Sequence, residues 1–341
     1  MDRKNKYSQV KSTQFGFALV LVLWVLSLLT IMAGSFALTM RRESTVVAGI
    51  KDNAGAIATA EAGIAYAEMM LLNPEPNKSW RADGNIYQVD FGDTRIRLRL
   101  LSESGKIDIN KADLPLLQAL FSQAPAEEEQ QAKLVAAIMD WRDPDDLLSI
   151  DGAEKEEYKD AGLKYQPRNK PFQTMEELQM VLGMDEHIYN WLEPVITVYS
   201  GQPQVNLKLA STKVMKIIPN LDTTLIESYV ATRLDSAKND LPTPEFQGGL
   251  VKSGILGASN ETIKITSEAL MADETSAIVV ATVLKSGAGQ SGLSDTNQPP
   301  PFNILEWRRN PTNGESLFTD EMSELLVKQY AEPELSDWPG F

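Results

Sequence analysis

The residues whose types could do chemistry are concentrated in one acidic run, residues 140–160. Pro144 and Gly152 interrupt this run, so we expect a loop rather than one regular helix. Carboxylates on a flexible loop suit Ca²⁺, which takes about six to eight oxygen ligands. The spacing does not match an EF-hand, and a solvated acidic loop without a metal is the alternative. The candidate calcium ligands are Asp143, Asp145, Asp146, Glu154 and Glu157.

The composition excludes most other kinds of site. The chain has no cysteine, which rules out disulfides, thiolate zinc sites and cysteine nucleophiles. The single histidine, His187, lies among apolar residues, and histidine catalysis usually needs an orienting partner. A periplasmic hydrolase using Asp145 and Asp146 as general acid and base is an alternative, but neighbouring side chains on a loop point apart. We therefore predict that the chain is not an enzyme.

Two features that could favour nucleic acid are outweighed by the net charge of −15, which repels phosphates. Arg95, Arg97 and Arg99 alternate with apolar residues, which predicts a strand with one solvated basic face. Residues 205–233 resemble a helix-hairpin-helix. Its hairpin, residues 219–222, has no glycine for a close phosphate approach and adds a carboxylate. We predict no nucleic acid partner.

The N-terminus carries the strongest signal. Residues 1–16 are polar and basic, and residues 17–40 contain no charged side chain until Arg41. Such a run exceeds the roughly 20 residues that span a bilayer, and the flanking lysines predict a cytoplasmic N-terminus. A secretory signal peptide cleaved near residues 34–37 is the alternative. However, an amphipathic pattern of small and apolar residues continues through residues 44–72, which predicts one long helix.

The junction between Gly16 and Phe17 resembles a type IV prepilin signal. The resemblance implies cleavage between these two residues by prepilin peptidase and N-methylation of Phe17. Most such proteins have a glutamate at the fifth mature position, which is Leu21 here. The protein K family of type II secretion pseudopilins lacks that glutamate, and three further segments resemble it: DWRDPDDLLSIDGAEKEEY, NKPFQTMEELQMVLGM and PFNILEWRR. The resemblance covers roughly residues 10–309.

This resemblance implies a minor pseudopilin at the pseudopilus tip, which initiates assembly and supports protein export across the outer membrane. Its implied partners are minor pseudopilins I and J, prepilin peptidase and the inner-membrane secretion platform. It also implies a single-pass inner-membrane protein with a periplasmic C-terminal domain, and calcium bound in the helical domain. A minor pilin or tip adhesin of another type IV filament is the alternative function.

The expected fold is α+β: a long N-terminal helix and a pseudopilin-like antiparallel sheet, interrupted by a helical insertion resembling helix-hairpin-helix or SAM domains. Alternating apolar residues predict a hairpin over residues 86–101 and strands at 263–270, 276–285 and 302–307. A Thr-x-x-Glu capping box predicts a helix over residues 175–182. The expected divisions are a leader (1–16), a transmembrane helix (17–40), an amphipathic helix with the first strands (41–107), the insertion (108–245), the closing strands (246–309) and an acidic tail (310–341) that holds a short helix at 319–330.

Overall fold

The computed structural model describes residues 15–75, 78–246, 260–286, 300–312 and 314–330. The chain divides into two units, residues 1–55 and residues 56–341. The predicted leader lies almost wholly outside the described residues. Within them, one helix is apolar and long enough to cross a membrane by length and composition, a test that a signal sequence would also pass. That helix is α1 (Phe15–Leu71), and its apolar residues from Ala18 to Ile50 are exposed.

The last turns of α1 belong to the second unit and pack on a sheet. Ala60, Ile64 and Ala67 are buried there at spacings of four and three residues, which place them on one helix face. A Cβ atom at Gly63 would lie 2.4 Å from Ser267 Oγ and 2.9 Å from a methyl carbon of Ile96. Glycine therefore allows the close approach of helix and sheet. The buried face is only part of the stripe expected over residues 44–72, since the residues before Ala56 are largely exposed.

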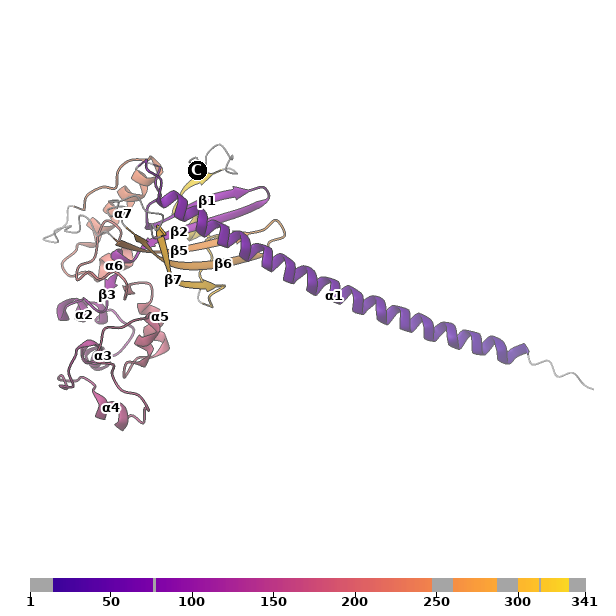
Figure 1. Ribbon diagram of the computed structural model, residues 1–341, viewed down its shortest axis with the longest axis horizontal. Coiled ribbons are helices and arrows are strands. Elements are labelled where there is room, and N and C mark those ends of the chain that lie inside the picture. The colour runs from indigo at the N-terminus through magenta and orange to yellow at the C-terminus, as the bar shows by residue number, and fades with distance from the viewer. Residues whose placement is uncertain (1–14, 76–77, 247–259, 287–299, 313, 331–341) are drawn as a thin grey trace, which may run out of the picture. The chain divides into compact units, whose positions relative to one another are not determined.

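The sheet has six strands in the order β7-β6-β5-β2-β1-β8, all neighbours antiparallel except β1 and β8, which are parallel (Figure 1). The predicted hairpin turns at Gly92, whose φ of 55° lies in the left-handed region that glycine adopts readily. The structure confirms the α+β class and the predicted strands. Their bounds are β1 (Asp83–Phe91), β2 (Thr94–Ser102), β5 (Asn260–Leu270), β6 (Ser276–Ser286), β7 (Phe302–Arg309) and β8 (Leu326–Tyr330).

A helical insert between β2 and β5 builds a second hydrophobic core of its own, which runs from Ile107 to Tyr229. Two short parallel strands, β3 (Ile107–Asp108) and β4 (Ile196–Thr197), pair within it. Figure 1 shows α2 to α5 gathered apart from the large sheet. The helical elements are α2 (Leu114–Phe121), α3 (Glu128–Arg142), α4 (Lys155–Asp160), η2 (Met175–Met180), α5 (Glu186–Leu192), α6 (Thr212–Ile217) and α7 (Thr223–Lys238).

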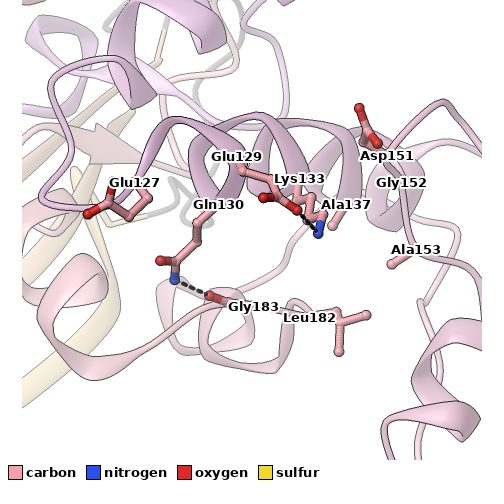
Figure 2. A pocket seen from close by; sticks show the side chains of 10 residues that line it. All are labelled: Glu127, Glu129, Gln130, Lys133, Ala137, Asp151, Gly152, Ala153, Leu182 and Gly183. Atoms are coloured by element: carbon pink, nitrogen blue, oxygen red, sulfur yellow. Dashed lines mark hydrogen bonds and ion pairs between the residues drawn. The ribbon is translucent and has the colours of Figure 1, made fainter.

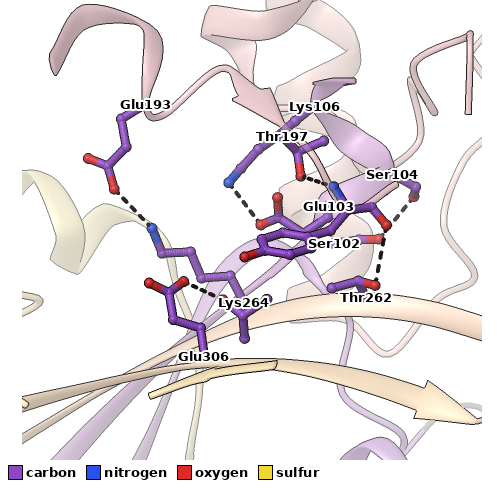
Figure 3. A network of polar contacts seen from close by, with 11 residues as sticks. Ser102, Glu103, Ser104, Lys106, Glu193, Thr197, Thr262, Lys264 and Glu306 are labelled. Atoms are coloured by element: carbon purple, nitrogen blue, oxygen red, sulfur yellow. Dashed lines mark hydrogen bonds and ion pairs between the residues drawn. The ribbon is translucent and has the colours of Figure 1, made fainter. Parts of the chain in front are cut away.

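Buried polar contacts join the insert to the sheet (Figure 3). After β2, the one-turn 3-10 helix η1 (Glu103–Gly105) precedes Lys106, whose Nζ lies 2.8 Å from Glu103 Oε1, with both side chains over nine-tenths buried. Lys264 on β5 pairs with Glu193 after α5 at 3.4 Å. Burial, with the nearby charge of Lys106, lowers the pKa of Lys264. The Lys264–Glu193 pair therefore links the sheet to the helical insert, whereas the Lys106–Glu103 pair is local to the connection after β2.

The C-terminal segment covers the arginine-bearing face of β2, so the prediction of a solvated basic face is wrong. Arg97 donates to Gln88 Oε1 (3.1 Å), the Leu317 carbonyl (2.7 Å) and Ser323 Oγ (2.9 Å), and its guanidinium lies 4.6 Å from the centre of the Phe318 ring. Such contacts satisfy the donors that burial removes from water.

The short helix predicted at residues 319–330 is α8 (Asp320–Glu324) followed by β8. Because β8 pairs with β1, residues 326–330 are part of the sheet rather than of a separate tail. The helix predicted at residues 175–182 is the 3-10 helix η2, and the predicted capping box is wrong, since the Thr174 side chain makes no cap bond.

Candidate functional site

Asp140, in the last turn of α3, organises the acidic loop. Its carboxylate is fully buried, and Oδ2 accepts hydrogen bonds from the backbone N–H groups of Ser149 (3.3 Å) and Ala153 (2.9 Å). A Cβ atom at Gly152 would lie only 1.9 Å from the same oxygen, so a glycine is required where the loop passes it. The loop is therefore wrapped around one carboxylate.

Four carboxylate oxygens in this loop are buried without a hydrogen-bond partner: Asp140 Oδ1, Asp143 Oδ1 and both oxygens of Glu154. Burial, together with the charges of Asp140 and Asp143, raises the pKa of Glu154 to about 7. Burial also raises the pKa of Asp143, and the charges of Asp145 and Asp140 add to that shift. Buried carboxylates left unpaired are costly, and cations are the groups that relieve such a cluster.

The other three candidate ligands each use one oxygen in a hydrogen bond, two within the loop and one with Asn169. Asp145 Oδ1 accepts from the backbone N–H of Leu147 (3.0 Å), and Asp146 Oδ1 accepts from the side-chain amide of Asn169 (2.7 Å). Glu157 Oε2 accepts from the backbone N–H of Glu154 (2.9 Å). In the described part of the chain, no three acidic or histidine side chains converge closely enough to hold a metal ion as they stand. Mutual repulsion of like charges would keep such carboxylates apart without a cation.

The donor set nevertheless fits a hard cation, because it offers partly buried carboxylate oxygens and no competing lysine or arginine bond to them. The structure brings Asp143 and Glu154 together with Asp140, which the sequence analysis placed in the acidic run but did not choose as a ligand. The signal for Asp140 was its position between Met139 and Trp141 on an apolar helix, where a carboxylate needs a partner.

A neighbouring pocket of about 620 Å³ opens between α3, residues 151–153 and residues 182–183 (Figure 2). Three of its polar side chains already have partners: Lys133 pairs with Glu129 at 2.6 Å, and Gln130 donates to the backbone carbonyl of Gly183 at 3.1 Å. Its lining holds no serine, threonine or histidine to act as a nucleophile or base. His187 is exposed in the first turn of α5.

The predicted processing site lies at the edge of the described chain. Gly16 and Phe17 fall in the first turn of α1, and residues 1–14 lie outside the described residues. Leu21, at the position of the missing glutamate, is a helical residue with 53% of its surface exposed. The cleavage and the methylation stay predictions.

Comparison with known proteins bears on these observations. Residues 94–201, which cover β2 and much of the helical insert, match the family model for type II secretion system protein K. Type II secretion system protein K of Klebsiella pneumoniae is 27% identical over 214 residues, covering 57% of this chain and 66% of that protein. The same protein of Pectobacterium carotovorum subsp. carotovorum is 30% identical over 81 residues, covering 24% of this chain and 25% of that protein. Over residues 94–201 the chain therefore resembles the type II secretion system protein K family.

The matches to these two members of the protein K family span less than two thirds of either relative's length. Among solved structures, a chain of the GspK-GspI-GspJ complex from the enterotoxigenic Escherichia coli Type 2 Secretion System is similar with a TM-score of 0.48 and 14% identity. That similarity covers 80% of this chain and 100% of the other.

Proposed function

We propose that this chain is a minor pseudopilin of a type II secretion system, located at the pseudopilus tip, where it initiates assembly and supports protein export. The observation that carries the proposal is the protein K match over residues 94–201 in a chain that also has the apolar helix α1. The similar solved chain is part of a complex with GspI and GspJ. We infer that minor pseudopilins I and J are the partners of this chain as well.

The tip position has a physical rationale in Leu21. A carboxylate within the membrane is costly unless it meets a partner such as the N-terminal amine of an adjacent subunit. A subunit with an apolar residue at this position needs no such partner above it. That arrangement suits the first subunit of a filament, which has no subunit above.

The helical insert supports the same position. It is a body with its own core, inserted between β2 and β5 of the sheet. A filament that repeated so large a side unit on every subunit would be crowded, whereas a terminal subunit has free space around it. Because the family match begins at Thr94 and ends at Gly201, most of the match falls on this insert.

The proposed function also implies a membrane topology. Residues 17–40 form a single inner-membrane span, with the basic N-terminus in the cytoplasm and the soluble part in the periplasm. Prepilin peptidase cuts between Gly16 and Phe17 and methylates Phe17, and the inner-membrane secretion platform then receives the mature subunit. No enzymatic activity is proposed.

Two measurements test this function. The first is the intact mass and N-terminal sequence of the membrane protein, with and without prepilin peptidase. A mature chain that begins at Phe17 only when the peptidase is present supports a pilin-like subunit, and a start near Ala37 means a cleaved signal peptide. The second is protein secretion by a deletion strain. Normal secretion together with loss of another type IV filament would favour the alternative of a minor pilin or adhesin.

We also propose that the acidic loop binds calcium. The unpartnered buried oxygens of Asp140, Asp143 and Glu154 support this site, and Asp145, Asp146 and Glu157 each keep one further oxygen that could contribute. Bound calcium would neutralise the cluster and hold α3, the loop and α4 together. Calorimetry of the protein at millimolar calcium tests the proposal, and absence of any binding would leave a solvated acidic loop.

A further inference from the structure

A groove between α2 and α3 is a surface feature that the proposed function does not use. It encloses about 560 Å³ and is lined by apolar side chains of both helices, among them Phe121 and Val135, which are buried. Ile150 lines the groove from the acidic loop, and 92% of its surface is exposed. Together with the groove lining, this exposed side chain forms a contiguous apolar surface, which is the kind of surface that binding partners cover.

The charges around the groove are all of one sign. Glu128, in the first turn of α3, and Asp151, next to Ile150, are its charged lining residues, and no lysine or arginine lines it. Both carboxylates are exposed. A molecule that buries an apolar side chain in this groove therefore brings the residues beside that side chain close to Glu128 and Asp151. Lys or Arg at those positions would complement the negative charge. The pocket in Figure 2 differs, because Lys133 lies there and pairs with Glu129.

The loop that carries Ile150 is held in place before anything binds. The backbone N–H groups on both sides of Ile150 and Asp151, those of Ser149 and Ala153, donate to the buried Asp140 carboxylate. A rim fixed in this way loses less conformational entropy on binding than a free loop would.

The same charges argue against other classes of occupant. Anionic lipid headgroups and nucleic acid phosphates are repelled by an acidic rim. The C-terminal residues 331–341 include Trp338 and Phe341 but also three carboxylates and no lysine or arginine, so they lack the complementary charge.

We propose that the groove between α2 and α3 is a docking surface for another protein, which inserts an apolar side chain flanked by Lys or Arg. Interhelical grooves commonly receive the apolar face of an amphipathic helix in this way. Ile150 and the groove residues cover the apolar anchor, while Glu128 and Asp151 pair with the flanking cations. The proposal depends on neither calcium binding nor the tip position.

Photo-crosslinking in cells with the complete secretion system tests it. Gln118 is exposed on α2 and lines the groove, so the full-length chain with p-benzoylphenylalanine at position 118 places the probe at the site. We expect a covalent adduct on irradiation, with the crosslink mapped by mass spectrometry to a segment of another protein that has Lys or Arg within about four residues of an apolar side chain. Asp151→Lys and Ile150→Ser should each lower the adduct yield about fivefold.

Glu127→Lys is the matched control, because Glu127 has the same charge, precedes Glu128 and lines the pocket of Figure 2 instead of the groove. It should leave the yield unchanged. Any of four results overturns the proposal: no adduct, an adduct insensitive to Asp151→Lys, an adduct equally sensitive to Glu127→Lys, or a crosslink mapped to a second copy of this chain. A crosslink to residues 247–259 of the same chain, which include Lys252 among apolar residues, would overturn it too.

Discussion

Replacing Glu154 by glutamine distinguishes a cation site from a solvated acidic loop. Glu154 is 6% exposed, and both of its carboxylate oxygens are buried without partners. Burial, with the charges of Asp140 and Asp143, raises its pKa from an ordinary 4.5 to about 7. Glutamine keeps the size and shape of the side chain but carries no charge at any of these pH values.

The sign of the effect follows from proton linkage. Between pH 4.5 and 7 the folded state keeps a proton on Glu154 that the unfolded state releases. The associated stability is fully present below pH 4.5 and is lost as pH rises to about 7. A shift of this size corresponds to at most about 3 kcal/mol of unfolding free energy. Without calcium, Glu154→Gln should therefore be more stable than the wild type at pH 8, by up to about 3 kcal/mol, and similar to it at pH 4.

Urea unfolding of a fragment without residues 1–40, followed by circular dichroism, measures this difference. The experiment is done with a chelator and again with millimolar calcium. If calcium binds, it should stabilise the wild type by about 2–3 kcal/mol at a hundredfold excess over the dissociation constant, and the variant by much less.

Glu156→Gln is the matched control, because Glu156 is exposed two residues away and pairs with Lys159 at the surface. Its unfolding free energy should stay close to that of the wild type, because an exposed ion pair contributes little to stability. The reasoning fails if, in the chelator, Glu154→Gln is no more stable than the wild type at pH 8. It also fails if the stability of the wild type does not fall between pH 5 and pH 8 relative to that of the variant. Either result would mean that water already satisfies the Glu154 carboxylate.

Three further predictions follow from particular contacts. Arg97→Met should lower the unfolding free energy, measured by urea unfolding, by about 3 kcal/mol, because the Leu317 carbonyl and Gln88 lose a buried donor. Arg95 is exposed, so the control variant Arg95→Met should lower it by less than about 1 kcal/mol. Gly63→Val should cost about 2 kcal/mol or more in thermal unfolding, since its Cβ would overlap Ser267, while Gly49→Ala, with nothing within 4 Å, should be neutral or stabilising. Leu21→Glu should reduce secretion in a complementation assay, and Leu21→Met should not, because the proposed tip position offers a carboxylate at this site no partner.

Local sequence patterns were sufficient to predict most strands of the sheet. Alternation of Ile96, Leu98 and Leu100 with arginines defined β2, and Gly92 marked the turn before it, because a strand period and a left-handed turn are properties of adjacent residues. At residues 175–182 the same local reasoning predicted a helix correctly but not its type or its N-terminal cap. There the Glu177 carboxylate accepts from the backbone N–H of Gln173 and pairs with Arg168, so a Thr174 cap does not form and the segment winds as a 3-10 helix.

Long-range partners could not be inferred from the sequence. Arg97 alternates as a solvent-facing residue should, yet the groups that cover it lie 220 to 226 positions later in the chain. The acidic C-terminal segment was likewise expected to be a tail, with no partner predicted for it. The two features explain each other, since Glu315 and Glu321 lie in the segment that covers β2 and their charges act on Arg99, opposing the lowering of its pKa by burial.

The acidic loop shows where the limit of such inference lies. The high density of carboxylates in this loop was evident in the sequence. The fold, however, decides which carboxylates are exposed to solvent and which are buried. Asp145 and Asp146 are exposed and find partners within the loop or at Asn169. Asp140 and Glu154 are buried. Asp140 precedes Trp141, which is buried on α3, and Glu154 precedes α4, on which Tyr158 is buried. Packing of apolar neighbours therefore leaves the Glu154 carboxylate without a partner, and either a bound proton or the calcium ion proposed above would relieve its charge.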